Sequence, residues 1–172
     1  MSSIPNTNYS NYIMNPDNQI TGMRLGGRLN QAKILTYEDG SEWVFLTDKG
    51  KERFCGFLYL QNALKESNIE NIEAAENKIA IYDKKIIYLS KYYGDEKPDP
   101  WKNLDKIQAI RKTGFSDLSN CANLREQNGK TYIFDTEKFS FNPDVHNEID
   151  SFAPVHDEII ESLLQLASEQ TY

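Results

Sequence analysis

Three oxygen-bearing side chains, Asp117, Asn123 and Asp135, have the types and spacing that suit chemistry. Asp117 and Asn123 lie in a polar turn, and Asp135 follows an apolar strand pattern that begins after Gly129. Carboxylate and amide oxygens can hold Mg²⁺ against phosphate oxygens, and a carboxylate can orient or deprotonate a hydroxyl. The pattern predicts a metal–nucleotide site with Asp117 as catalytic group and Asn123 and Asp135 as metal ligands. The alternative is an ordinary surface hairpin, because the same residue types are common in turns.

The composition limits the partners of this chain. Its 172 residues carry a formal net charge of −7, which makes nucleic-acid backbones and anionic membranes poor partners. A small anionic ligand is compatible with this charge, because local Lys and Arg side chains decide its binding. No basic region precedes an apolar run at the N-terminus, and no stretch approaches transmembrane length. We therefore expect a protein of the cytoplasm of the producing cell, without a nucleic-acid or membrane partner.

Cysteine and histidine usage is sparse. The only cysteines are Cys55 and Cys121, and the only histidines are His146 and His156. These residues lack the paired spacing of a disulfide framework or a zinc site. We expect neither feature.

The N-terminal part of the chain has the pattern of a sheet. Residues 1–21 are rich in Asn, Ser and Pro and predict a flexible or draped arm, followed by a single domain over residues 22–172. Asp39 and Gly40 form a strong hairpin signal. Strands are predicted at residues 23–25, 32–37, 43–47, 78–83 and 85–93.

One amphipathic helix interrupts these strands after the third. It is predicted over residues 49–67, where Phe57 and Leu64 fall at helical spacing and should pack on the sheet. Residues 68–77 are polar and acidic and predict an extra helical turn. A hinge is predicted at residues 94–100, because Gly94 ends the strand run and prolines stiffen the connector.

The C-terminal part predicts a small helical and hairpin lobe. A helix over residues 100–112 leads to Asp117, and a last helix covers residues 155–167. Phe139 and Phe141 are expected to act as anchors. The apolar residues predicted on one face of the first of these helices are Trp101, Leu104, Ile107 and Ile110. The fold class is therefore α+β, with an antiparallel five-stranded sheet, a packed helix and a small helical and hairpin lobe.

This order of elements resembles the core of protein-kinase-like folds over residues 22–141, in a minimal version. The strand end Phe134-Asp135-Thr136-Glu137 is most similar to small-molecule kinases such as aminoglycoside and choline kinases. The resemblance implies an adenine nucleotide, ATP, ADP or AMP, bound with Mg²⁺. It assigns the catalytic-base position to Asp117 and the metal positions to Asn123 and Asp135. The positions it assigns to nucleotide binding are Gly26, Gly27 and Arg28 in a phosphate-covering turn and Tyr92, Tyr93 and Gly94 in an adenine-binding hinge.

The departures from the kinase pattern concern the phosphate end of the site. Asp117 and Asn123 are six residues apart, whereas the family spacing is five, and Phe115 replaces a histidine. Leu46 lies where the third strand should carry a phosphate-binding lysine. Lys33 on the neighbouring strand is a candidate substitute, although a strand lysine is more often a solvated side chain. We expect nucleotide binding with weak or no protein-kinase activity.

Length excludes the large helical lobe that holds peptide substrates in protein kinases. The chain resembles the compact kinase-like nucleotide-binding modules of effector proteins from intracellular bacterial pathogens, which are likened to the nucleotide site of SAICAR synthetase. Its acidic C-terminus resembles the glutamate-rich tail of secreted effectors, and a packed final helix is the alternative. A second hypothesis is a pseudokinase-type module that binds a protein partner without catalysis. The aromatic surface considered for that partner consists of Tyr82, Tyr88, Tyr92 and Tyr93.

Overall fold

The computed structural model describes residues 6–27 and 31–169, and the chain divides into two compact units. The first unit contains the chain up to Lys51, residues 76–92 and the chain from Ala153 onward. The second unit contains residues 52–75 and 93–152. Among the described residues, no helix combines the length and the apolar character that crossing a membrane requires.

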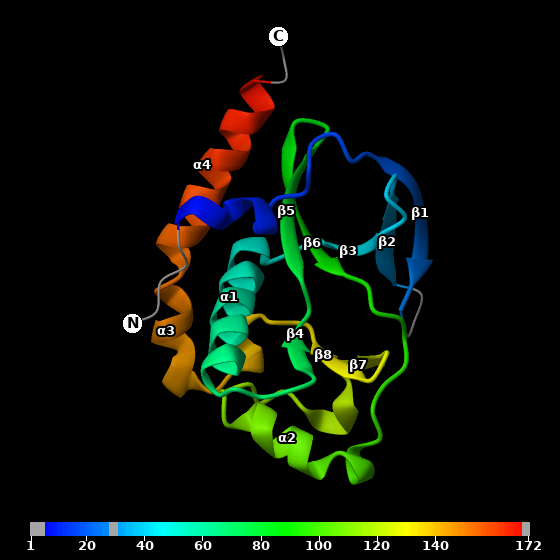
Figure 1. Ribbon diagram of the computed structural model, residues 1–172, viewed down its shortest axis with the longest axis vertical. Helices are drawn as coiled ribbons and strands as arrows, with labels where there is room; N and C mark the ends of the chain where they lie inside the picture. Colours follow the sequence, from blue (N-terminus) through cyan, green and yellow to red (C-terminus); the bar gives the residue numbers. More distant parts are fainter. Residues whose placement is uncertain (1–5, 28–30, 170–172) are drawn as a thin grey trace. The chain divides into compact units, whose positions relative to one another are not determined.

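The first unit is built on a five-stranded antiparallel sheet (Figure 1). Its strands lie in the order β1-β2-β3-β6-β5. Their bounds are β1 Ile20–Gly26, β2 Ala32–Tyr37, β3 Glu42–Leu46, β5 Asn77–Tyr82 and β6 Lys85–Lys91. The five predicted strands are confirmed, and the Asp39-Gly40 turn joins β2 to β3, with Gly40 at φ 85°. A cluster of buried side chains includes Leu35, Tyr37, Trp43, Ala80 and Leu89.

Two helical segments pack within the same unit. The 3₁₀ helix η1, Asn6–Tyr12, runs between α4, Ala153–Glu169, and β5 (Figure 1). The Tyr9 hydroxyl donates a hydrogen bond to the Glu158 carboxylate, and the Met14 amide donates to the Ile79 carbonyl at 2.9 Å. The described part of the N-terminal segment is therefore draped over this unit. Scattered apolar residues of this segment, such as Tyr9 and Met14, are buried. The overall composition, rich in Asn and Ser, gives little indication of this burial.

The last predicted helix is confirmed as α4, and it is amphipathic. Ile159 and Leu163 are buried, while Leu164 and Leu166 on the same helix are exposed. His156 is also buried in α4, where its ring stacks on Tyr88 of β6.

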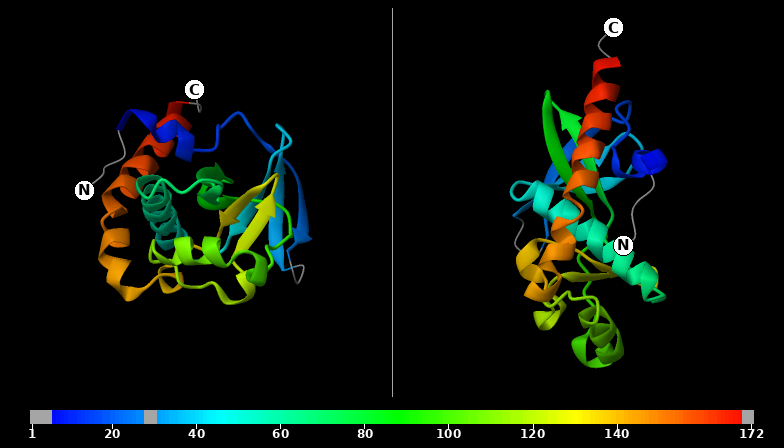
Figure 2. Two further views of the ribbon diagram at one scale, coloured as in Figure 1. Left: turned by 60° about the horizontal axis from the view of Figure 1, so that its bottom comes forward. Right: turned by 90° about the vertical axis from the view of Figure 1, so that its left-hand side faces the viewer.

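The second unit combines a long helix with a three-stranded sheet. Helix α1, Gly50–Glu66, belongs to this unit from Glu52 onward. Phe57 and Leu64 of α1 are buried, as predicted, whereas their packing on the five-stranded sheet stays a prediction. The sheet has the order β4-β8-β7, and the left view of Figure 2 shows the β7–β8 hairpin as yellow arrows. The strands are β4 Ile72–Ala74, β7 Leu124–Gln127 and β8 Lys130–Ile133. The helices α2 Leu104–Arg111 and α3 His146–Asp150 complete this unit.

The helical turn predicted within residues 68–77 is wrong. Ile72 to Ala74 form β4, which pairs in parallel with β8, with Ile72 opposite Thr131. The strand depends on a partner almost sixty residues away, so the local polar composition carries little signal for it. The buried side chain of Ile72 fixes this strand in the unit.

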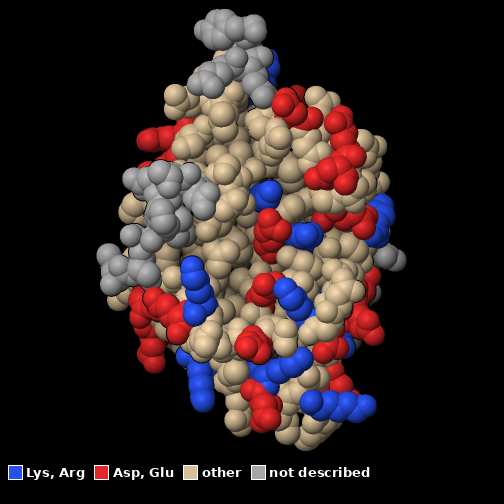
Figure 3. All heavy atoms as spheres, in the orientation of Figure 1, with Lys and Arg blue, Asp and Glu red and all other residues tan. Residues whose placement is uncertain are grey.

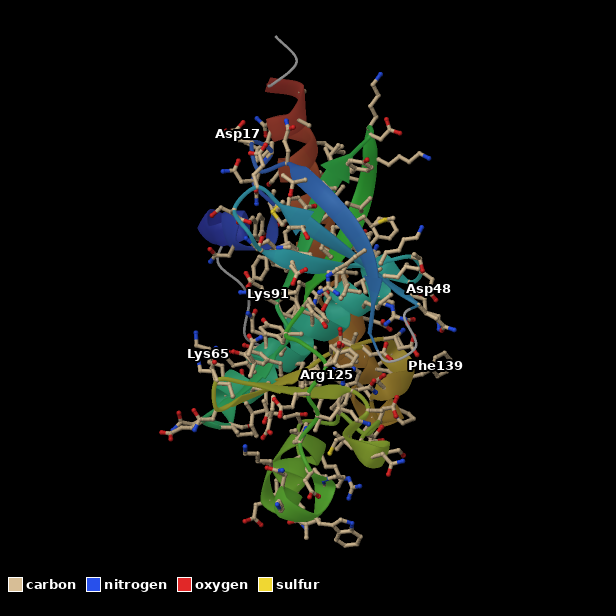
Figure 4. The ribbon with its side chains drawn as sticks, turned by 90° about the vertical axis from the view of Figure 1, so that its right-hand side faces the viewer. Asp17, Asp48, Lys65, Lys91, Arg125 and Phe139 are labelled. Atoms are coloured by element: carbon tan, nitrogen blue, oxygen red, sulfur yellow. The ribbon has the colours of Figure 1, made fainter. Side chains whose placement is uncertain are left out.

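Two predictions of buried aromatic residues are also wrong. Trp101 is 84% exposed, because it lies in the separate 3₁₀ turn η2, Pro100–Lys102, and α2 begins only at Leu104, itself exposed. The Asp99 side chain caps η2 by accepting a hydrogen bond from the Trp101 amide at 2.9 Å. Phe139 is 78% exposed and lies at the surface (Figure 4), whereas Phe141 is buried as expected.

Candidate functional site

The predicted metal-binding residues Asn123 and Asp135 flank the open end of the β7–β8 hairpin. The last register pair of the hairpin is Leu124 with Ile133, and the Phe134 amide extends it by donating to the Asn123 carbonyl at 3.0 Å. Asn123 and Asp135 therefore lie at the same end of one hairpin. Asp135 leaves the strand at φ 62°, a left-handed backbone conformation that is uncommon for a residue with a side chain.

The loop that carries Asp117 is fixed to this hairpin end. The Asn123 side-chain amide donates from Nδ2 to the Asp117 carbonyl at 3.1 Å, and the Asp117 amide donates to the Ser140 carbonyl at 3.2 Å. Asn123 is buried, whereas Asp117 is exposed. The structure thus holds the backbone of Asp117 on two sides and leaves its carboxylate in contact with solvent.

Phe115, which the kinase resemblance assigns to a histidine position, has a packing role. Its side chain is fully buried and meets Phe141 edge to face, with ring centroids 5.2 Å apart. Phe115 and Phe141 also form an isolated antiparallel bridge. The departure from the kinase pattern at this position therefore contributes to the core that supports the Asp117 loop.

Arg53 of α1 is the residue of this site that the sequence interpretation missed. Its guanidinium donates from Nη1 to Asp135 Oδ1 and from Nη2 to Glu137 Oε2, the latter at 3.1 Å. The side chain of Arg53 is 16% exposed, and those of Asp135 and Glu137 are 30% and 22% exposed. One cation therefore joins the predicted metal ligand to a second carboxylate two residues later.

The helix that carries Arg53 is in close contact with the segment after Asp135. The Thr136 hydroxyl donates to the Arg53 carbonyl at 2.7 Å, and the Lys138 amide donates to Glu52 Oε2 at 3.1 Å. A methyl group at Gly56 would overlap the Thr136 carbonyl oxygen and lie 3.0 Å from its carbonyl carbon. Gly56 therefore permits an approach of helix to backbone that a larger residue would prevent.

The sequence does contain a signal for Arg53. Arg53, Gly56, Phe57 and Leu60 fall at helical spacings of three and four, so the arginine lies on the buried face of α1. A charged residue within an apolar helical face indicates a paired group, because an unpaired charge is costly to bury. Only the structure identifies its carboxylate partners.

The remaining predicted site residues are divided between the units. Gly26, Gly27, Lys33 and Tyr92 belong to the first unit, and Tyr93 and Gly94 to the second. Arg28 lies outside the described residues. Gly26 is buried, and a methyl group there would overlap Ile34 Cδ1, while Gly27 has φ 78°. Local structure thus explains why each of these positions is occupied by glycine. Their role in nucleotide binding stays a prediction.

The two strand positions considered for phosphate binding in the first unit are Lys33 and Leu46. Lys33 is exposed on β2, opposite Leu25 of β1. Leu46 is half-buried on β3, opposite Tyr88 of β6. Neither Lys33 nor Leu46 therefore supplies a cation held in position by neighbouring groups, and the phosphate role of Lys33 stays a prediction.

The tyrosines considered for a partner surface mostly have contacts within their own unit. The Arg24 guanidinium lies over the Tyr92 ring at 5.2 Å, and Tyr93 stacks on Tyr132 with centroids 3.7 Å apart. The Tyr88 hydroxyl is 2.7 Å from His156 Nε2. Tyr82 is 57% exposed and remains a surface residue of the β5–β6 hairpin.

Figure 3 shows the surface charge on one face of the described residues. On the face drawn in Figure 3, basic and acidic side chains lie interspersed over much of the surface. Within residues 6–27 and 31–169, no three His, Cys, Asp or Glu side chains gather as a metal-binding group.

Comparison with protein-family models and with curated protein sequences finds no match for this chain.

Proposed function

We propose that this protein binds an adenine nucleotide together with Mg²⁺ and is a minimal kinase-like protein with weak or no phosphotransferase activity. One observation carries the proposal: the end of the β7–β8 hairpin holds Asn123 and Asp135, and Asn123 also binds the backbone of Asp117. These three residues are the ones that the sequence assigns to metal and catalysis. The order of strands, helix and hairpin in the structure is also the order on which the kinase resemblance depends.

The proposal assigns Mg²⁺ to the hairpin end because Asn123 and Asp135 carry oxygen donors of the kind that Mg²⁺ prefers. Nδ2 of Asn123 is engaged by the Asp117 carbonyl, so the amide oxygen is the atom this side chain can offer to a cation. Asp135, the residue after Phe134, adds a carboxylate at the same end of the hairpin. Two protein oxygens suit Mg²⁺, which binds through one or two side chains, several waters and the phosphates of its substrate. In the proposed site, Mg²⁺ supplies positive charge that neutralises phosphate oxygens.

Asp117 has the features of a group that orients a hydroxyl. Its backbone is held by Ser140 and Asn123, while its carboxylate is exposed. A fixed backbone limits the positions of the carboxylate, and such positioning accounts for much of the rate enhancement in phosphoryl transfer. Any transfer activity should therefore depend on Asp117, whereas nucleotide binding should not.

A thermal-shift screen tests the proposal. ATP, ADP and AMP are each added with and without Mg²⁺, and a nucleotide at a hundred times its dissociation constant should stabilise the protein by about 2.7 kcal/mol. The expected result is a shift for ATP or ADP that grows with Mg²⁺. Asp135→Asn should remove the Mg²⁺-dependent part, and Asp117→Asn should keep it. The absence of a shift with every nucleotide would refute the proposal.

A pseudokinase-type interaction module is the second candidate, and one observation favours it. Trp101 in η2 and Leu104, the first residue of α2, are 84% and 53% exposed. Large exposed apolar side chains often mark protein-binding surfaces. A protein that gives no nucleotide shift, but loses binding to its partner when Trp101 is replaced by Ala, would support this candidate.

The proposal includes a bacterial effector role, in which the protein acts in a host cell. It rests on the resemblance to compact kinase-like effector modules and on the acidic C-terminal sequence. Helix α4 is packed in the first unit through Ile159 and Leu163, so these residues have a structural role whether or not the protein is secreted. A translocation assay with a reporter fused to the protein, with and without residues after Ala167, tests this role.

A further inference from the structure

Arg53 lies between two carboxylates, Asp135 and Glu137, at the proposed metal site. We propose that Arg53 binds the phosphate chain of a nucleoside di- or triphosphate, as the cation that this site uses in place of a strand lysine. The inference rests on the proposed nucleotide function and specifies which group recognises the phosphates. It places the phosphate-binding cation on α1, next to Asp135.

Charge balance supports this role. The guanidinium of Arg53 contacts Asp135 and Glu137, so the three groups together carry a net charge of −1. A divalent cation on Asp135 changes this net charge to +1, which favours a polyphosphate. The same metal site without Arg53 would be electrically neutral. Arg53 therefore makes the metal-loaded site attractive to an anion.

The position of Arg53 supports the role as well. Glu137 holds Nη2 at 3.1 Å, and this contact can keep the guanidinium in place while Asp135 binds metal. The Arg53 carbonyl accepts the Thr136 hydroxyl at 2.7 Å, so its backbone is fixed to the same segment. Arginine presents a planar set of N–H donors that matches two phosphate oxygens at once. With only 16% of the side chain exposed, solvent weakens such a contact less than on an open surface.

Two other cations of the second unit, Lys138 and Arg125, have different partners. Lys138 Nζ is 2.7 Å from Asp150 Oδ1, and this hydrogen bond raises the pKa of Lys138. Arg125, on the β7–β8 hairpin (Figure 4), lies over the Phe134 ring at 4.5 Å and donates to the Leu124 carbonyl at 2.8 Å. Arg53 differs from both, because its guanidinium donates directly to Asp135.

The experiment compares ligands that differ in their phosphates. Isothermal titration with adenosine, AMP, ADP and ATP, all in excess Mg²⁺, is done on the wild type and on Arg53→Met. The expected result is a loss of ADP and ATP affinity on the order of tenfold to a hundredfold, because a charge-assisted contact is lost. Adenosine affinity should stay within about twofold of the wild type, since adenosine makes no phosphate contact. Arg111→Met, which removes an exposed arginine of the same unit, is the matched control and should match the wild type.

Each other outcome overturns the inference in a distinct way. Equal losses for adenosine and ATP would make Arg53 a structural residue, and unchanged ATP affinity would remove it from the phosphate site. Tighter ATP binding by Arg53→Met would show that Arg53 competes with the metal for Asp135. A wild type that binds none of the four ligands would refute the proposed function itself. If Arg53→Met does not fold, Arg53→Lys is tested in its place. Its affinity for ADP and ATP should fall about threefold, because lysine lacks the planar donor pair, and its affinity for adenosine should not change.

Discussion

Substitution of Gly56 by alanine tests the close contact between α1 and the segment after Asp135. Alanine is a better helix former than glycine by about 1 kcal/mol, so an unconstrained site in α1 would gain stability. At Gly56 the added methyl group would overlap the Thr136 carbonyl oxygen. Overpacking of this kind costs about 1–3 kcal/mol, and weakening of the Thr136–Arg53 hydrogen bond costs about 1 kcal/mol more. The net expectation is a loss of about 1–3 kcal/mol.

Urea denaturation followed by circular dichroism measures this loss. Gly22→Ala is the control, because Gly22 has no neighbouring atom within 4 Å of an added methyl group and no positive φ. The control should change the free energy of unfolding by less than about 0.5 kcal/mol. Equal or higher stability of Gly56→Ala would refute the described contact between α1 and Thr136.

Three further substitutions or conditions probe other parts of the structure. Leu64→Ala should cost about 2–5 kcal/mol in urea denaturation, because a buried leucine leaves a cavity, and a cost under about 0.5 kcal/mol would contradict its burial. Burial lowers the pKa of His156 below its ordinary 6.5. Between the pKa of the folded protein and pH 6.5, the unfolded chain therefore binds more protons than the folded protein. The free energy of unfolding should therefore fall as pH drops below about 6.5, and His156→Gln should remove that slope. Asp135→Asn should lower apo stability by about 0.5–2 kcal/mol, because it breaks the partly exposed pair with Arg53, and unchanged stability would contradict that pair.

The Asp135 prediction reverses what the sequence alone suggests. A carboxylate near other acids should repel them, so its neutralisation would leave stability equal or higher. The structure instead pairs Asp135 with Arg53, eighty-two residues earlier in the chain. An arginine at the start of a helix does not indicate which distant carboxylate it will meet. The stability effect of Asp135 therefore depends on tertiary structure.

Local patterns were sufficient for most of the framework. The Asp39-Gly40 turn and the apolar alternation around it specify β2 and β3, and the helical spacing of Phe57 and Leu64 specifies the buried face of α1. These features depend on neighbours within a few residues. The sequence pattern therefore carries them directly.

Features that depend on distant partners escaped prediction. Ile72 to Ala74 form a strand because β8 lies beside them, although their composition is polar and acidic. Trp101 is exposed because its turn η2 ends at Lys102, and Asn103 separates this turn from α2. The candidate site divides in the same way, since the residue types of Asn123 and Asp135 were visible in sequence, whereas the contact of Asp135 with Arg53 of α1 was not.

Direct titration of Mg·ATP into the protein tests the central claim most directly. The wild type should bind with a measurable dissociation constant that weakens when Mg²⁺ is replaced by a chelator. Asp135→Asn should bind at least about tenfold more weakly in Mg²⁺ and lose the dependence on the metal, because a metal ligand is removed. Equal affinity of wild type and Asp135→Asn for Mg·ATP, or no heat of binding from the wild type, would contradict the account.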